Sequence, residues 1–118
     1  MPMRTREVAV VARGEGADPR QALALALALP LGGCDVVLVL EGEARGMATR
    51  AETTGGKRPD EMAEQMEALL ADDSVEIVVR SDPHQDRALV THLRPEVRAL
   101  GADAIEARCR QADHWLVM

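Results

Sequence analysis

The sequence predicts an α/β protein with three layers, α/β/α, built around a mostly parallel five-stranded sheet. Three Val-rich segments, at 7–13, 35–40 and 75–80, are apolar without alternation, as strands buried on both faces are. Stretches that favour helices separate them, and strands alternating with helices build parallel sheets. The length of 118 residues fits one domain spanning residues 1–118.

The first helix has clear start signals. Gly14 and Gly16 allow a tight turn after the first strand, Asp18 stands where an N-cap belongs, and Pro19 suits the first helical position. Residues 21–29 alternate Ala and Leu, a period that suits a strand, but both residues are strong helix formers and a cap precedes them. Because this helix is apolar on all sides, we expect a second copy of the protein to cover the side that the sheet leaves open.

The remaining elements are short or amphipathic. They are a helical turn at 43–50, a polar loop at 53–59, a helix at 60–71, a helix at 83–92, a strand at 97–100, a helix at 103–112 and a strand at 114–117. The helix at 60–71 has an apolar stripe made of Met62, Met66, Leu69 and Leu70. The helix at 83–92 follows Ser81-Asp82-Pro83, which repeats the cap-then-proline signal.

Composition and charge exclude several classes of function. The chain has one Trp, no Phe or Tyr, and a formal charge of −6, so neither base stacking nor phosphate-backbone contacts are favoured, and we expect no nucleic-acid partner. We see no apolar run that would span a membrane and no secretory signal. We therefore expect a cytoplasmic protein that does not bind membranes.

In parallel sheets, ligands bind at the carboxyl ends of the strands, so the residues there are the candidate site. Gly14 and Glu15 follow the first strand and look like a phosphate-binding turn, but the third glycine of a dinucleotide fingerprint and the Gly-Lys-Ser/Thr of a P-loop are missing. A tight turn before a capped helix explains them more simply. Glu41 follows the second strand, and Arg80 ends the third.

A metal site and a catalytic Ser–His pair near the third strand are less well supported. Asp82, His84 and Asp86 have a spacing that metal ligands can have, but residues two apart on a helix point in different directions, so we expect no metal and no cofactor. Ser81 and His84 lack a third residue that would orient the imidazole.

The two cysteines, Cys34 and Cys109, have no CxxC spacing, and too few are present for a disulfide framework. Cys109 shares a helix face with Ile105, as a small buried hydrophobic residue would. Cys34 precedes the second strand, away from the expected site.

Together, the order and spacing of these pieces resemble the DsrE/DsrF-like sulfur-relay family, including its YchN-like branch. Four segments carry the resemblance over essentially the whole length. They are the strand at 8–12 with its Gly/Pro turn and Ala/Leu helix, the segment 33–43 with its acidic end, the Met/Leu helix with the strand at 75–79, and the closing segment 111–118. The resemblance implies a five-stranded α/β domain that assembles into homotrimers or homohexamers. It also implies, in active members, a persulfide-bearing cysteine just after the third strand and transfer of that sulfur to a partner protein.

This chain departs from the family pattern at the cysteine. The family's Arg-Gly pair resembles Arg87-Ala88 here, and counting back to the cysteine position leads to Arg80, in a loop without cysteine that runs from Arg80 to Gln85. We therefore expect a non-catalytic binding or scaffold subunit in sulfur relay or sulfur metabolism, which binds a small anion or an acidic partner segment through Arg80, Ser81 and His84. The alternative for Arg80 itself is an ion pair with Asp82 or Asp86.

Two other functions stay open. One is a sulfurtransferase or sulfur carrier that uses Cys109 or Cys34 in place of the missing residue. The other is a regulatory domain that binds a small ligand.

Overall fold

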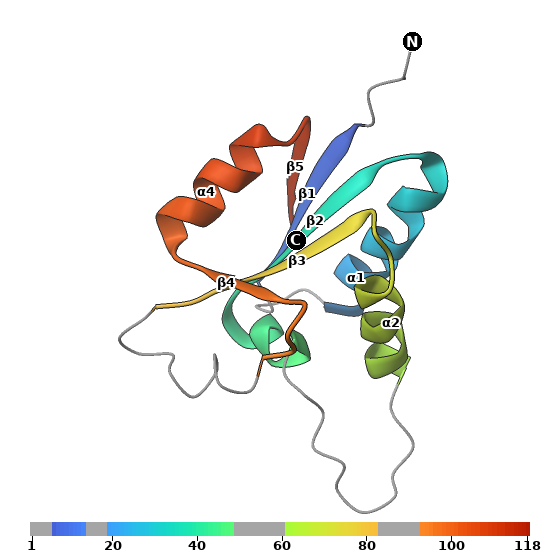
Figure 1. The fold of residues 1–118 in the computed structure, drawn as a ribbon, viewed down its shortest axis with the longest axis horizontal. Coiled ribbons are helices and arrows are strands. Elements are labelled where there is room, and N and C mark those ends of the chain that lie inside the picture. Colours follow the sequence, from blue (N-terminus) through green and yellow to red (C-terminus); the bar gives the residue numbers. More distant parts are fainter. Residues whose placement is uncertain (1–5, 14–18, 49–60, 83–92) are drawn as a thin grey trace, which may run out of the picture.

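The computed structural model describes residues 6–13, 19–48, 61–82 and 93–118. Its centre is a five-stranded sheet with the order β4-β3-β2-β1-β5 (Figure 1). All neighbouring strands pair in parallel, so the predicted mostly parallel sheet is confirmed and is parallel throughout the described residues. The strands are β1 (Glu7–Ala12), β2 (Asp35–Leu40), β3 (Val75–Arg80), β4 (Arg98–Leu100) and β5 (His114–Val117).

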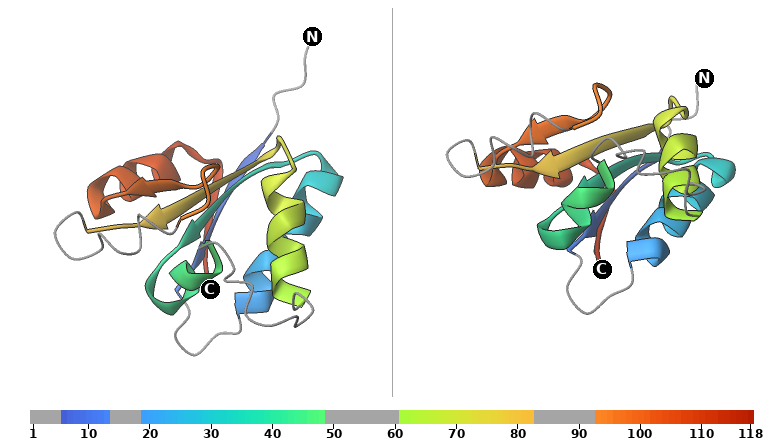
Figure 2. Two further views of the ribbon diagram at one scale, coloured as in Figure 1. Left: turned by 60° about the horizontal axis from the view of Figure 1, so that its bottom comes forward. Right: turned by 90° about the horizontal axis from the view of Figure 1, so that it is seen from below.

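Helices cover both faces of the sheet, which confirms the three-layer prediction. Helices α1 (Pro19–Ala28) and α2 (Glu61–Leu70) lie on one side, and α4 (Ala102–Gln111) lies on the other (Figure 2). Two short 3-10 helices, η1 (Leu29–Gly32) and η2 (Gly42–Ala48), follow α1 and β2. No helix among the described segments is long and apolar enough to span a membrane.

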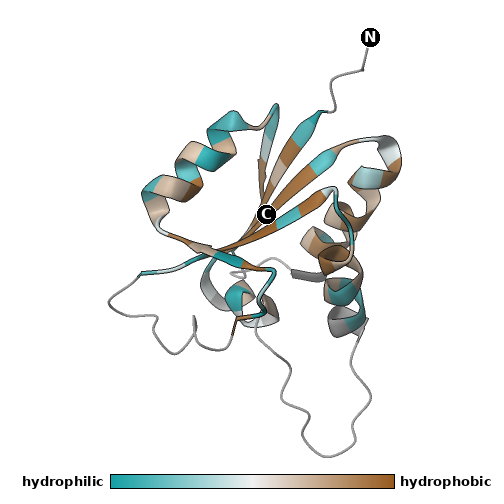
Figure 3. Ribbon diagram, viewed as in Figure 1, coloured by the Kyte–Doolittle hydropathy of each residue, from teal (hydrophilic) through white to brown (hydrophobic). Residues whose placement is uncertain are grey.

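The core explains why the strand sequences do not alternate. Val8 and Val10 of β1 are buried on the side of α1 and α2, while Ala9 and Val11 are buried on the side of α4. Strands β2 and β3 divide their apolar side chains between the two cores in the same way. Figure 3 shows the hydrophobic colour running along the central strands. A strand covered on both faces needs apolar residues at every position.

Most predicted boundaries agree with the structure. Helix α1 begins at Pro19 as predicted, and β2 and β3 have the predicted bounds. The predicted loop at 53–59 and the predicted helix at 83–92 lie outside the described residues, as does the proposed N-cap Asp18.

Helix α1 has a neighbour that its sequence does not indicate. Helix α2 lies beside it on the same face of the sheet (Figures 1 and 2). Leu23 is buried in the core, and Leu25 and Leu27 are partly buried against the same cluster, which includes Met66 and Leu69 of α2. Helix α2 therefore covers part of the surface that we expected a second copy to cover.

An ionic contact holds α4 on the sheet. Arg108 of α4 donates to both carboxylate oxygens of Glu7 in β1, at 2.5 and 2.8 Å, and to Glu76 in β3, at 3.1 Å. The three side chains are only partly exposed, so the contact is partly shielded from water. The hydrogen bond from Arg108 lowers the pKa of Glu7. The Arg108 guanidinium thus links α4 to both β1 and β3, the strands on either side of β2.

Gly42 is required by the close approach of two strand ends. Its φ angle of 57° lies in the left-handed region, where residues with a Cβ are disfavoured. A Cβ at this position would also lie 2.6 Å from the backbone oxygen of Arg13. Gly42 therefore lets the chain leave β2 and enter η2 directly against the end of β1.

We predict that Gly42→Ala lowers the free energy of unfolding by about 1–3 kcal/mol, the usual cost of a side chain in strained left-handed backbone. Urea denaturation, monitored by circular dichroism, measures this free energy of unfolding. Gly46→Ala is the matched control, because Gly46 lies in the same 3-10 helix and a Cβ there would meet nothing within 4 Å. The control should change stability by less than about 0.5 kcal/mol, and equal losses in the two variants would contradict the assigned role of Gly42.

We predict that Arg108→Met lowers the free energy of unfolding by about 2 kcal/mol at neutral pH. The variant removes both hydrogen bonds from Arg108 to the partly buried Glu7 carboxylate and leaves Glu76 with Arg98 as its arginine partner. The pKa of Glu7 is lower in the folded protein than its ordinary value of 4.5, so the stability it contributes is present above that pH and is lost as the pH falls through the folded value. The difference between native protein and variant should therefore shrink in urea titrations between about pH 5 and pH 3.

Arg110→Met is the control for this effect, because Arg110 pairs with Glu106 on the exposed side of α4 and its side chain is 72% exposed. Such surface pairs contribute little, so we expect a change below about 0.5 kcal/mol. A pH-independent loss in Arg108→Met would show that packing of the Arg108 side chain, and not its charge, holds α4.

Candidate functional site

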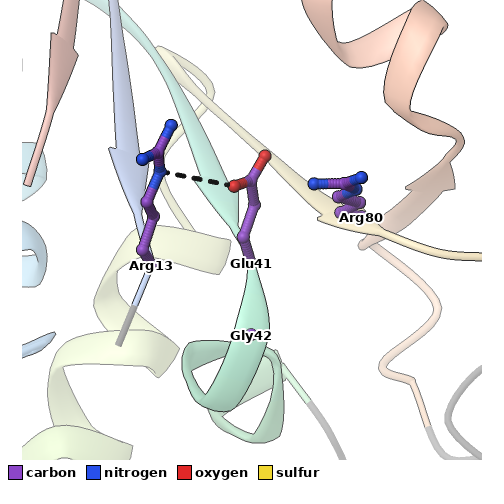
Figure 4. Close-up of a pocket in the computed structure, with 4 residues that line it drawn as sticks. All are labelled: Arg13, Glu41, Gly42 and Arg80. Atoms are coloured by element: carbon purple, nitrogen blue, oxygen red, sulfur yellow. Dashed lines mark ion pairs between the residues drawn. The ribbon is translucent and has the colours of Figure 1, made fainter. Parts of the chain in front are cut away.

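The carboxyl ends of β1, β2 and β3 meet at one edge of the sheet and frame a cavity of about 420 Å³. Arg13, Glu41, Gly42 and Arg80 line it (Figure 4). Each of the three strands thus contributes a residue at or just beyond its last position. The structure brings Glu41 and Arg80 together, as the strand-end rule predicted.

Backbone hydrogen bonds fix the first two charged residues. The Glu41 amide donates to the Ala12 carbonyl at 2.8 Å, which continues the β1–β2 ladder beyond the last residue of β2. The Arg13 amide donates to the Met118 carbonyl at 3.3 Å. From these positions the Nε of Arg13 lies 3.7 Å from the Oε2 of Glu41. The Glu41 side chain is 17% exposed and that of Arg13 is 60% exposed, so a shielded carboxylate faces a solvated guanidinium.

Arg80 is the exposed last residue of β3 and lies across Glu41 from Arg13. Figure 4 shows the Glu41 side chain standing between the two arginines. No carboxylate in the described part of the chain forms an ion pair with the Arg80 guanidinium, so the expected alternative, a pair with Asp82, is not found. The other candidate partner, Asp86, lies outside the described residues.

Arg45 of η2 donates hydrogen bonds to the backbone of two residues that line the cavity. Its Nε donates to the Gly42 carbonyl at 3.0 Å, and its Nη1 reaches the Arg80 carbonyl at 3.4 Å. These contacts join the turn after β2 to the end of β3. Arg45 therefore helps to fix the distance between the end of β2, which leads into Glu41, and the end of β3, which is Arg80.

The charges of the lining residues favour an anion. Two guanidiniums, from Arg13 and Arg80, stand against the single carboxylate of Glu41, so these side chains carry a net positive charge. Guanidinium groups present planar sets of N–H donors that match oxyanions and carboxylates. No cluster of three metal-ligating side chains occurs within the described ranges, and His84 and Asp86 fall outside them.

One predicted site residue is placed away from the cavity, and three others are not described by the structure. Ser81 is buried, with 8% exposure, and its amide donates to the Leu100 carbonyl at 2.9 Å, so it packs between β3 and β4 and is not among the residues that line the cavity. Gly14, Glu15 and His84 lie outside the described residues.

The two thiols are not in the cavity. Cys109 is 1% exposed on the face of α4 that packs on the sheet. Burial, followed by the charge of Glu41, raises its pKa despite the opposing effect of Arg108. Cys34 is half-buried just before β2, at the amino-terminal ends of the strands and away from the cavity. It packs against the core on the side of α1.

Sequence reasoning misses Arg13 and Arg45, and it includes Gly42 in the strand-end segment 41–43 without giving it a role. A signal for Arg13 does exist, because it stands at the end of the first strand as Arg80 stands at the end of the third. The sequence pattern includes Arg13 in that strand, so only the residues after it enter the predicted site. No local pattern marks Gly42, since the carbonyl that requires it belongs to Arg13, on another strand.

Comparisons with known proteins support the fold. No protein-family model matches the chain, and no curated protein sequence does. Among solved structures, the chain is similar to the crystal structure of the YchN protein from E. coli, with a TM-score of 0.75 and 21% sequence identity, over 98% of this chain and 100% of that one. At this identity the similarity establishes the architecture and leaves the function open. The chain therefore shares the DsrE/DsrF-like α/β fold of the YchN protein.

Proposed function

We propose that this chain is a DsrE-like binding or scaffold subunit that holds a small anion at the strand-end cavity between Arg13 and Arg80. The observation that carries the proposal is the Arg80 guanidinium, which lies on the cavity without a carboxylate partner among the described residues. An exposed cation on a parallel sheet, at the edge where such sheets bind ligands, is suited to bind an anion.

Glu41 restricts which anion fits. Its carboxylate stands between the two arginines, so a fully deprotonated dianion would be repelled at close range. A ligand that offers acceptor oxygens to Arg80 and one proton to Glu41 makes favourable contacts with both. Bisulfite and hydrogen phosphate have this combination, and the cavity of about 420 Å³ has room for either. The protonated carboxyl of an acidic segment from a partner protein has the same chemistry.

A role in sulfur relay or sulfur metabolism is part of this proposal. The fold is that of the YchN protein, and the order and spacing of the sequence segments resemble a family of sulfur-relay proteins. The chain has no cysteine between Arg80 and Gln85, where the family carries its persulfide. We therefore propose that the subunit binds a sulfur oxyanion or an acidic segment of a relay partner and does not carry the sulfur covalently.

The alternative is a sulfurtransferase or sulfur carrier that uses Cys109 or Cys34. Burial raises the pKa of Cys109, which lowers the fraction of nucleophilic thiolate at neutral pH. Mass spectrometry of the folded protein after exposure to a persulfide donor distinguishes the two functions. A stable gain of one sulfur on Cys109 or Cys34 would favour the carrier.

We predict that isothermal titration calorimetry at low salt detects binding of phosphate and sulfite, and that Arg80→Gln weakens it by about tenfold or more, equivalent to about 1.4 kcal/mol. Glu41→Gln should strengthen binding of thiosulfate, which brings no proton for the carboxylate, more than it strengthens binding of phosphate. This difference would identify Glu41 as the residue that selects among anions.

Arg98→Gln is the matched control, because Arg98 is an exposed arginine whose side chain pairs with Glu76 and does not line the cavity. Its heats should equal those of the native protein. Equal heats from native protein and Arg80→Gln, or no binding of any of the three anions, would refute the proposed site.

A further inference from the structure

Strand β5 forms an open edge of the sheet and exposes three consecutive apolar side chains. Among the described strands it pairs with β1 alone, at the end of the strand order. Trp115, Leu116 and Val117 are 47%, 43% and 49% exposed. Natural edge strands are usually protected by charge, proline or a covering element, and β5 contains no Lys, Arg, Asp, Glu or Pro. The apolar surface and the unpaired backbone therefore coincide on one short strand.

The hydrogen bonds of Met118 show which backbone groups face outward. Its amide donates to the Val11 carbonyl at 2.8 Å, and its carbonyl accepts from the Arg13 amide at 3.3 Å, so the backbone groups of Met118 point toward β1. Because direction alternates along a strand, those of Leu116 also point toward β1, while the N–H and C=O groups of Trp115 and Val117 face the open edge.

We propose that β5 pairs in antiparallel fashion with β5 of a second copy of this chain, around a two-fold axis at Leu116. In this register Trp115 of each copy lies opposite Val117 of the other, and their outward backbone groups exchange hydrogen bonds. Leu116 lies opposite Leu116. Each exposed apolar side chain of the strand thus meets an apolar one, and pairs of an aromatic with a β-branched residue are favourable across strands.

Charge also favours a second copy in this orientation. β5 begins directly after Asp113 and ends beside Arg13, whose amide is bonded to Met118. Antiparallel pairing brings Asp113 of one copy to the end of the contact where the other copy carries Arg13, which lies one strand further in, on β1, and also pairs with Glu41. Parallel pairing would place like charges together. The charges that flank the strand therefore favour the antiparallel direction.

A two-fold contact of this kind requires an even number of copies. Two chains, or six chains if the three-fold assembly implied by the family resemblance also forms, satisfy it, and a lone trimer does not. The proposed contact therefore restricts the predicted oligomer to one with an even number of copies. It does not depend on anion binding, so failure of either proposal leaves the other intact.

The oligomeric state of the full chain tests the contact. Multi-angle light scattering at about 100 µM should give an even multiple of the 12.7 kDa chain mass. Val117→Lys should halve that mass, because it brings two charges into the contact. Leu31→Lys, at a residue 91% exposed on η1, should leave it unchanged. A native monomer or trimer, or an unchanged mass in Val117→Lys, would overturn the proposal.

Cross-linking tests the register even if Val117→Lys fails to fold. Two Leu116 residues on the axis form a non-hydrogen-bonded antiparallel pair, whose Cα atoms lie about 4.5 Å apart, within the range of a disulfide. Leu116→Cys should therefore give a covalent dimer on mild oxidation, well above the background set by the two native cysteines. Leu31→Cys is the exposed control and should stay at background, and a Leu116→Cys yield equal to it would contradict the register.

Discussion

The parallel alignment of β1, β2 and β3 is the constraint on which the rest of this molecule depends. Val10, Leu38 and Ile77 lie side by side in register, and the three strands end within one residue of one another, at Ala12, Leu40 and Arg80. Residues that are far apart in the sequence therefore meet at one edge of the sheet. The cavity between Arg13, Glu41 and Arg80 exists only because the strands run in the same direction and end at the same height.

The two ends of the sheet use charge in different ways. Near the start of β1, Arg108 satisfies Glu7 and Glu76 together and fixes α4 to the sheet. At the carboxyl end, Glu41 pairs with Arg13, and Arg80 has no carboxylate partner among the described residues. Paired charges at one end stabilise the fold, whereas the excess positive charge at the other end is available to a ligand. This difference separates the structural arginine from the candidate binding arginines.

Much of the fold could be predicted from local sequence patterns. Continuous Val-rich runs predicted β2 and β3 with their observed bounds, and Pro19 marked the start of α1. The strand-end rule also brought Glu41 and Arg80 to one site, because parallel strands align their ends whatever the order of the sheet. These features depend on neighbouring residues or on a general property of parallel sheets, so they can be inferred without coordinates.

The missed features depend on contacts between distant residues. Arg108 and Glu7 are 101 positions apart, and nothing around either one indicates the other. Gly42 is needed because the Arg13 carbonyl passes close to it, and that approach follows from the packing of two strand ends. The exposure of Trp115 follows from the position of β5 at the edge of the strand order, which the alternation of strands and helices does not determine.

The central claim is that Arg80 and Arg13 hold an anion together at the strand ends. Nuclear magnetic resonance of the arginine Nε–Hε groups during a phosphate titration tests it most directly, since each side chain gives its own signal. We expect the Arg80 and Arg13 signals to shift along one common binding curve while the Arg98 signal stays in place. Signals that shift only at other arginines, or that move with no saturation at any arginine, would contradict the claim.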